Sequence, residues 1–535
     1  MVSLSAVPDY ESSIVSSVVG KVFYGAESIV NWAMGKSRSR ESNPYLAGNY
    51  SPVEQERFDE ELLVEGELPA DLSGCFLRIG SNPKMRPMGG YHWFDGDGMV
   101  HACRVKNGRV FYANRWVKTA RFKKEQAVGW DTHLKIGDMV GAGGLLALAF
   151  SKLKGLAGLT VGGEGRGTAN TAMVFHAGRL LALHEGDMPY ALRVACEGIV
   201  ETAGRLVYQG QRSFTAHPKV DPATGDMHFF GYSVESAPYC TYGVAGPDGA
   251  LKKQIPITVP KPVMMHDFAV TEAHAIFIDT PLVFDPSVMV REGTLPFAFD
   301  EGHGIRFGLR RHDAPEGEEA VQWFSSPPCM IFHVANAWDD GEKVHLVACA
   351  MRTLDLSVLS TKRAMTEDMK PFLTRFVFDT RTGETVVTRL SDCAAEFPQI
   401  KQSLVGRKCR YAFAARYHES PKGDAGFDGI CKFDLDASGP RDGHDACSGA
   451  ICFGEGRYGG EAIFVPKGSP KSEDDGYLLT YVYDEGRNKS DFVVFDAKTM
   501  SSEPIAKVQL PCRVPYGFHG LFMDEDDMKK QAGQS

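Results

Sequence analysis

The sequence predicts an all-β protein of the propeller type, built as one large domain. From about residue 74 onward, short runs rich in Val, Ile, Tyr and Phe alternate with turn residues, as strands prefer; examples are 108–117, 178–184, 274–279, 344–350 and 477–483. A similar turn recurs at 220–225, 378–383 and 495–500. Its spacings lie near multiples of about 39–40 residues, a period typical of four-stranded propeller blades. No Gly/Ser-rich or Pro-rich linker divides the chain.

The composition is that of a folded globular protein. Of 535 residues, 43% are hydrophobic and 24% charged, and the 57 Gly and 29 Pro indicate many turns. The net charge of −10 argues against a nucleic-acid partner, because duplex binders usually carry a basic face. The twelve Cys form no CxxC pair and lack zinc-type spacing, so we expect mostly buried, reduced thiols and a reducing compartment.

Two apolar segments precede or interrupt the strands. Residues 13–34 have near-helical apolar spacing, and Lys36, Arg38 and Arg40 follow the run, whereas a secretory signal places its positive charges before it. We expect an amphipathic helix packed on the domain; a membrane-surface helix or a weak plastid signal stays open. Residues 1–42 are therefore interpreted as a variable N-terminal segment and 43–535 as a single domain.

The second segment, residues 139–159, carries an i, i+3/i+4 apolar stripe with two lysines beside it. A stripe of this kind either faces the core or lies in a membrane interface. No run is long enough to predict a transmembrane helix, so the protein is expected in the cytoplasm, with peripheral membrane contact through 139–159; a plastid location stays open. The stripe and its lysines are Leu145, Leu146, Ala149, Phe150, Leu153, Leu156, Lys152 and Lys154.

Four of the sixteen histidines stand in distinctive contexts. They are far apart in the chain, unlike the local clusters of a zinc finger or an HExxH helix. Separated ligands fit a propeller, whose inner strands can each send one side chain to the axis. From the residues alone, four ordinary histidines beside strand ends remain the alternative. The four are His217 (in FTAHPK), His266 (in MMHDF), His333 (in IFHVANAW) and His519 (in PYGFHG).

Seven longer motifs resemble the carotenoid cleavage oxygenases, over about residues 43–524. The plant-type enzymes that cleave carotenoids at the 9,10(9′,10′) bonds are the most similar branch, through YLAGN (45–49), GYHWFDGDGM (90–99) and AIFVP (462–466). The seven are FDGDGM (94–99), AHPKVDP (216–222), MMHDFAVTE (264–272), FHVANAWDD (332–340), GEGRYGGEAIFVP (454–466), EDDGYLLTYVYDE (473–485) and RVPYGFHG (513–520).

The resemblance implies a seven-bladed β-propeller with helical insertions over its iron-bearing face. It implies a non-haem Fe(II) held by His217, His266, His333 and His519. Glu185, Glu396 and Glu461 would accept the ring N–H groups of these histidines, which fixes the tautomers. The plant branch often has Asp at the position of Glu396, and either carboxylate could serve. With three carboxylates for four histidines, one histidine lacks such a partner, and the sequence does not tell which.

The implied activity is dioxygenase cleavage of a conjugated C=C bond, with O2 and a lipophilic polyene as substrates. Such a ligand needs an apolar tunnel, for which the motifs supply Phe94, Phe332, Phe397 and Phe518. Phe332 and Phe518 directly precede two of the histidines, so a bulge or turn is required for both neighbours to face the axis. The same alternation argues that His184, beside Glu185, faces away; His101 and His274 are also interpreted as structural.

Three alternatives stay open. Relatives that cleave stilbenes carry Tyr where Phe94 stands and use it with a lysine to bind a phenol; in this chain Lys118 is the nearby lysine. A retinoid isomerase of the same fold shares the histidines. A non-catalytic propeller that binds apocarotenoids is the third. The scissile bond, single or double cleavage and the oligomeric state are not predicted.

Overall fold

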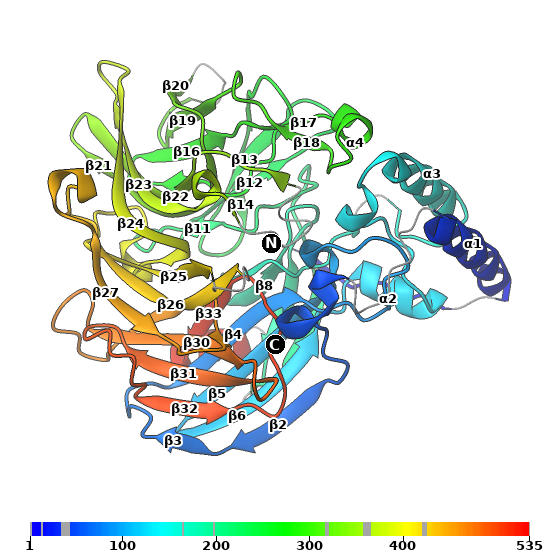
Figure 1. Cartoon of the computed structure of the whole chain (residues 1–535), viewed down its shortest axis with the longest axis horizontal. Helices are drawn as coiled ribbons and strands as arrows, with labels where there is room; N and C mark the ends of the chain where they lie inside the picture. Colours follow the sequence, from blue (N-terminus) through cyan, green and yellow to red (C-terminus); the bar gives the residue numbers. More distant parts are fainter. Residues whose placement is uncertain are drawn as a thin grey trace.

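The computed structural model describes residues 3–11, 14–33, 43–162, 165–195, 198–315, 320–356, 365–419 and 425–533. Antiparallel sheets follow one another around a ring, and helices gather at one side (Figure 1). The five predicted strands are all present, as β6 (Arg109–Trp116), β8 (Arg179–Leu183), β16 (His274–Asp279), β22 (Lys343–Met351) and β30 (Gly476–Asp484). The prediction of an all-β fold is confirmed.

Four of the blades come from separate sheets. Their strands, in the order of pairing, are β33 (Gly520–Asp524), β4 (Gly74–Ser81), β5 (Gly98–Lys106), β6 and β2 (Arg57–Leu62); β7 (Ala172–His176), β8, β9 (Tyr190–Val194), β10 (Val200–Val207) and β1 (Ser3–Ser5); β11 (Lys219–Val220), β12 (Met227–Tyr232), β13 (Cys240–Ala245) and β14 (Leu251–Ile257); β15 (Ala269–Val270), β16, β19 (Ile305–Arg311) and β20 (Val321–Ser326).

The remaining strands form two larger sheets and a hairpin. They are β21 (Met330–Asp340), β22, β23 (Phe372–Asp379), β24 (Thr385–Gln399), β25 (Tyr411–Glu419), β26 (Ala425–Asp434) and β27 (Cys447–Cys452); β28 (Arg457–Tyr458), β30, β31 (Lys489–Asp496), β32 (Ala506–Gln509) and β3 (Val64–Gly66), with β29 (Ile463–Pro466) also on β30; and the hairpin β17 (Leu282–Phe284) and β18 (Phe297–Phe299). The long strand β24 serves two blades, because its first part pairs with β23 and its second part with β25.

The hydrophobic core shows that the blades close into a ring. Buried clusters lie between successive blades: one joins β4 and β5 to β8 and β9, the next joins β8 to β12, and others follow to the last, which joins β30 and β31 back to β4–β6. Two strand pairs join C-terminal strands to N-terminal strands: β33 pairs with β4, and β32 pairs with β3. Counting β24 twice, the described residues form the seven blades of the predicted propeller.

The recurrent turn folds as predicted in all three places. The side chains of Asp221, Asp379 and Asp496 each accept hydrogen bonds from backbone N–H groups two or three residues on. The chain then enters the left-handed region, with φ of 71° at Gly225, 80° at Gly383 and 54° at Met500. Met500 shows that the Asp-based turn does not depend on a final glycine.

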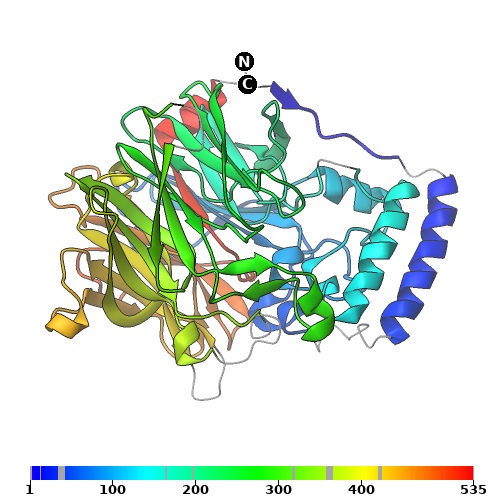
Figure 2. The ribbon, with the colours of Figure 1, turned by 90° about the horizontal axis from the view of Figure 1, so that it is seen from above.

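Helices α1 (Ile14–Ala33), α2 (Ala120–Val128) and α3 (Ala142–Leu156) lie together at one side of the blades, whereas α6 (Glu525–Ala532) lies apart from them, beside β33 and β9 (Figure 2). A further helix is α4 (Ser287–Arg291). Both apolar segments are helical, as predicted. The three-residue strand β1 adds to the edge of β10. The division at residue 42 stays a prediction, and Lys36, Arg38 and Arg40 lie outside the described residues.

Candidate metal centre

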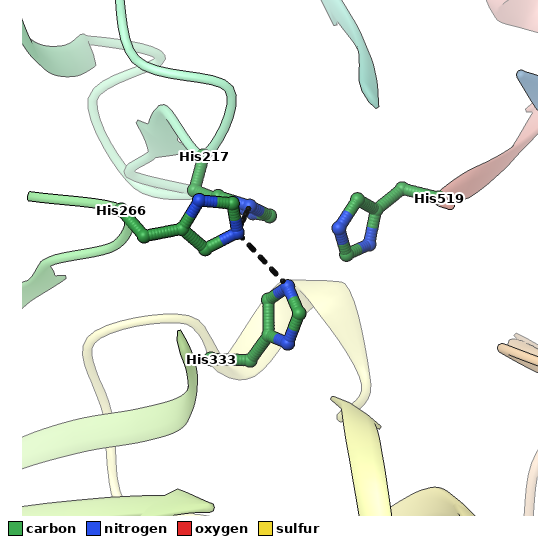
Figure 3. Close-up of side chains that lie close together, drawn as sticks. All are labelled: His217, His266, His333 and His519. Carbon is green, nitrogen blue, oxygen red and sulfur yellow. Dashed lines mark hydrogen bonds between the residues drawn. The ribbon is translucent and has the colours of Figure 1, made fainter. Parts of the chain in front are cut away.

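The four distinctive histidines converge on one point (Figure 3). One ring nitrogen from each of His217, His266, His333 and His519 lies within 4.8 Å of the other three. His266 Nε2 is 3.0 Å from His217 Nε2 and 3.2 Å from His333 Nε2. His333 and His519 are buried and the other two are partly buried. Residues from four blades therefore present imidazole nitrogens to a common centre.

The edge strands of the sheets position these histidines. His217 and His266 lie in the loops that enter β11 and β15, and His519 directly precedes β33. His333 lies inside β21, where the pairing with β22 shifts register between Ile331 and Val334. Each of these strands is the outermost of its sheet in pairing order. On the side that faces the centre of the ring, such an edge strand pairs with no further strand of its sheet, so side chains on or beside it can reach the axis.

Three carboxylates contact the outer ring nitrogens. Glu185 accepts a hydrogen bond from His266 Nδ1, Glu396 from His333 Nδ1 at 2.6 Å, and Glu461 from His519 Nδ1 at 2.9 Å. An Nδ1–H bonded to a carboxylate leaves the Nε2 lone pair free and makes it more basic. The three glutamates thus set three imidazoles in the tautomer that a metal ion requires.

Of the four converging histidines, His217 is the one to which the described residues offer no carboxylate partner. Burial lowers its pKa well below the usual range, and the nearby rings of His519, His266 and His333 lower it further. Burial likewise lowers the pKa of His519. Burial alone would lower the pKa of His333 too, but the negative charge of Glu396 and its hydrogen bond raise it. Burial therefore favours the neutral form of His217 and His519, which is the form in which histidine binds a metal ion.

Polar groups that the sequence analysis missed hold the glutamates in turn. The Tyr232 hydroxyl donates to Glu185 Oε2 at 2.9 Å, and Gln399 Nε2 donates to Glu461 Oε1 at 2.7 Å. The backbone N–H of Gly520 donates to Glu461 Oε2 at 2.6 Å. Tyr232 ends β12 and Gln399 ends β24, so no local motif marks either residue; only the fold brings them to the site.

Two aromatic rings line the histidines. The ring centroid of Phe397 lies 5.0 Å from that of His333 and 5.3 Å from that of His519, and the ring of Phe332 lies 5.6 Å from His266. Phe397 has φ of 56°, and the pairing of β24 with β25 shifts register between Glu396 and Gln399. This irregularity lets two successive side chains, Glu396 and Phe397, both approach His333.

Phe94 and Phe518 form a second aromatic group. Their ring centroids are 5.4 Å apart, and Trp93, which the sequence analysis missed, lies 4.5 Å from Phe518. Phe332 lies in the register shift of β21, and Phe518 lies in the loop that precedes β33. The bulge and the turn that the sequence analysis required are both present.

Three further histidines have different surroundings. His184 Nδ1 accepts the Gly186 N–H, His101 contacts the Tyr112 hydroxyl at 2.8 Å, and His274 contacts Asp339 at 2.8 Å. Strand alternation was the wrong reason to exclude His184, because β8 ends at Leu183 and Glu185 lies in a turn. Lys118 is exposed, so it does not stand with Phe94 as a buried phenol-binding pair.

Comparison with known proteins agrees with this geometry. Residues 50–524 match the model of the retinal pigment epithelial membrane protein family. Carotenoid 9,10(9′,10′)-cleavage dioxygenase 1 of Pisum sativum is 42% identical over 533 residues, which cover 97% of this chain and 94% of the relative. The chain belongs to the carotenoid cleavage oxygenase family.

Solved structures of the family share the fold. The lignostilbene dioxygenase of Pseudomonas brassicacearum superposes with a TM-score of 0.78 at 27% identity, over 90% of this chain and 99% of its own. Cobalt-substituted ACO of Synechocystis gives a TM-score of 0.74 at 26% identity, over 91% and 100%. The family match therefore covers the whole propeller, including every blade that contributes a histidine.

Proposed function

We propose that this oxygenase is a non-haem Fe(II) dioxygenase that cleaves carotenoids or apocarotenoids at the 9,10 and/or 9′,10′ double bonds, giving aldehyde and ketone products. The observation that supports it most is the convergence of four histidine nitrogens, three of them oriented by carboxylates. The 42% identical relative from Pisum sativum carries the name of that activity.

The donor set fits Fe(II). Imidazole suits iron, and four imidazoles leave two positions of an octahedron for other ligands. The ligands would be His217, His266, His333 and His519, with Glu185, Glu396 and Glu461 supporting them. When bound, Fe(II) supplies the chemistry with O2. Because the four imidazole ligands are neutral, they would not neutralise the positive charge of the ion.

The chain itself contributes position and exclusion of water. The carboxylates hold the rings of His266, His333 and His519 in one tautomer, with Nδ1 protonated and Nε2 free to bind the ion. Phe332 and Phe397 cover the sides of the histidines, and Phe94 and Phe518 extend the apolar lining. A flat, conjugated chain packs well between such rings. These side chains would hold one double bond beside the metal and keep bulk water away.

Stilbene cleavage is the second candidate, because the lignostilbene dioxygenase has the same fold. A phenol-selective site needs a hydrogen-bond partner for the hydroxyl. Phe94 has none to offer, and Lys118 is exposed. The aromatic group therefore favours an apolar polyene. A binding propeller without activity would need the same lining but no ordered histidines.

One incubation separates these functions. The purified, Fe(II)-loaded protein is mixed under air with β-carotene, β-apo-8′-carotenal or resveratrol, and products are identified by chromatography and mass. Loss of polyene absorbance with release of a C13 ketone is expected. Hydroxybenzaldehydes from resveratrol alone would replace the proposal by stilbene cleavage, and retention of an unchanged pigment would replace it by binding.

We further propose that α1 and α3 together form the surface through which the polyene enters from a membrane. In the described part of the chain no helix is long and apolar enough to span a membrane. Four apolar residues of the predicted stripe on α3 are instead exposed, and α1 exposes apolar side chains as well. The two helices lie side by side (Figures 1 and 2). The exposed residues are Leu145, Leu146, Leu153 and Leu156 on α3 and Val18, Val22, Ile29 and Trp32 on α1.

Side-chain contacts hold α1 to α3 and to Trp130, which follows α2. Lys154 is buried and binds Glu27 of α1 at 3.0 Å, so it is not a cation beside the membrane as its position in the stripe suggested. Tyr24 packs edge-on against Trp130 at 5.7 Å. The polar and aromatic contacts face inward while Trp32 and Leu156, 74% and 86% exposed, face outward. An apolar surface of this kind suits the interface of a bilayer.

Flotation with lipid vesicles tests the membrane proposal. Trp32→Glu with Leu156→Glu should shift the protein from the vesicle fraction to the soluble fraction, while Val386→Glu, at a 59% exposed site on β24, should not. Equal binding of all three proteins would contradict it. Detergent-dispersed substrate gives the control, because cleavage there should be the same for all variants. The cytoplasmic compartment stays a prediction.

A further inference from the structure

A second group of metal-binding side chains lies away from the histidines. One Sγ atom from each of Cys393, Cys431 and Cys447 lies within 4.8 Å of the other two. The three residues come from β24, β26 and β27, so their spacing in the sequence shows no metal-binding motif. All three are free thiols, as the sequence analysis expected, but their proximity was not predicted, because only strand pairing brings them together.

The strands fix the three thiols in different surroundings. Cys431 is fully buried in the hydrophobic core beside Ala414 and Phe433. Cys393 lies on β24 in the register shift of its pairing with β23, and Cys447 begins the edge strand β27; both are partly exposed. The group is thus closed on the side of Cys431 and open to small solutes on the side of the other two.

The surroundings favour the thiolate form at one of the three positions. Hydrogen bonding with Cys393 raises the pKa of the Cys431 and Cys447 thiols, whereas the pKa of Cys393 itself is lowered. Hydrogen bonds from Cys431 and Cys447, together with the Ser391 hydroxyl and the positive charge of Arg416, hold the pKa of the Cys393 thiol below that of an ordinary cysteine. The thiolate is the form of cysteine that binds a metal ion. Of the three neighbouring thiols, Cys393 is therefore the one that loses its proton most easily.

We propose that Cys393, Cys431 and Cys447 form a second metal site, which binds one thiophilic cation of the Zn²⁺ class. Tetrahedral Zn²⁺ has Zn–S distances of about 2.3 Å, which place its sulfur ligands about 3.8 Å apart. The observed limit of 4.8 Å allows that geometry with small rotations of the side chains. A solvent molecule on the open side completes the four ligands, and the thiol protons pass to the buffer on binding.

The thiol site differs from the histidine centre in its chemistry. Three sulfur ligands select soft ions, whereas four imidazoles suit Fe(II). Both sites use β24, since Glu396 lies on the same strand three residues after Cys393. The proposal nevertheless does not depend on the oxygenase activity, and its test reads sulfur ligation directly.

Cd²⁺ serves as the probe, because sulfur-to-cadmium charge transfer absorbs in the ultraviolet while cadmium bound to imidazole does not show that band. Fe(II)-loaded protein, kept reduced with a phosphine and free of oxygen, is titrated with Cd²⁺. We expect one tight equivalent with the intensity of three thiolates. Cys447→Ser and Cys393→Ser should each weaken binding at least about tenfold and lower the intensity.

Cys452→Ser is the matched control, because Cys452 is an exposed thiol on the same strand as Cys447 but outside the group. It should bind Cd²⁺ like the unmodified protein. The proposal is overturned if Cys452→Ser weakens binding as much as Cys447→Ser, or if no one-equivalent sulfur band forms. Intact mass measured without reductant supplies a further check, since a disulfide within the group in freshly purified protein would also overturn it.

Discussion

Two histidine–carboxylate pairs in this oxygenase show how the candidate metal centre differs from a structural hydrogen bond. At the centre, His333 Nδ1 contacts Glu396 and its Nε2 points toward the other rings. Beside α2, His133 Nδ1 contacts Glu125 at 2.8 Å in the same manner. There, however, Nε2 accepts the backbone N–H of Val161 at 3.0 Å. His133 has both nitrogens in use, so it can hold a loop but no metal.

The surroundings of the two carboxylates differ accordingly. Arg121, two backbone N–H groups and His133 surround Glu125; burial raises its pKa, but these partners lower it to about 2. Glu396 has one buried oxygen, Oε1, for which the described part of the chain offers no hydrogen-bond partner. In the structural pair, nearby groups satisfy both the carboxylate of Glu125 and the ring of His133. At the centre, Glu396 bonds Nδ1 of His333, and Nε2 of that ring faces the other histidines.

The largest expected effect comes from removing a converging nitrogen. His266→Ala should abolish stoichiometric iron binding and lower carotenoid cleavage by more than about 100-fold, because three imidazoles remain around a site shaped for four. Iron content by mass spectrometry and product formation are measured on the same sample. His274→Ala, which removes a histidine bound to Asp339 instead, should keep its iron. Full iron and activity in His266→Ala would show that the histidine group is not the metal centre.

Changing the carboxylates sharpens the comparison. Glu396→Gln should weaken iron binding about 10- to 100-fold with little loss of stability, since the amide holds the His333 tautomer less firmly. Glu125→Gln should do the reverse: iron affinity of the folded protein is unchanged, while the free energy of unfolding falls by about 3 kcal/mol. Iron competition with a chelator and denaturant unfolding measure the two quantities. The same loss of iron affinity in both variants would contradict the distinction.

The fold and the identity of the converging histidines could be predicted from the sequence, whereas the contacts around these histidines could be predicted only in part. Strand composition and the repeated Asp turns led to the propeller, and the family motifs led to His217 and its partners. Which histidine lacks a carboxylate depends on strand positions that no motif encodes. Tyr232, Gln399 and Trp93 were missed for that reason, and so was the group around Cys431. Contacts between blades join residues far apart in the chain, where local patterns carry no signal.

A smaller effect is expected from the loop that places His519. A Cβ added at Gly517 would lie 2.7 Å from the Ile79 carbonyl oxygen, and this loop pairs with β4 through the Phe518 N–H. Gly517→Ala should lower the free energy of unfolding by about 1–3 kcal/mol and reduce iron affinity, because the loop must move away from β4. Gly162→Ala, where an added Cβ meets no atom of the described residues within 4 Å, should change neither quantity. Thermal unfolding and iron titration measure the two quantities. Unchanged iron affinity in Gly517→Ala would show that the position of this loop does not affect iron binding.

The smallest effect tests how far the support of the centre extends. Tyr232→Phe removes the hydroxyl that donates to Glu185, which in turn orients His266. A hydrogen bond of this kind contributes about 1 kcal/mol, so iron affinity should fall by at most about fivefold. Tyr242→Phe removes a hydroxyl from the same blade that contacts His228 Nδ1 at 2.6 Å, away from the four converging rings. It should leave iron affinity unchanged. A fall in Tyr232→Phe alone would show that the chain from tyrosine through glutamate to histidine acts as one unit, whereas equal affinities would limit the functional contacts to the glutamates themselves.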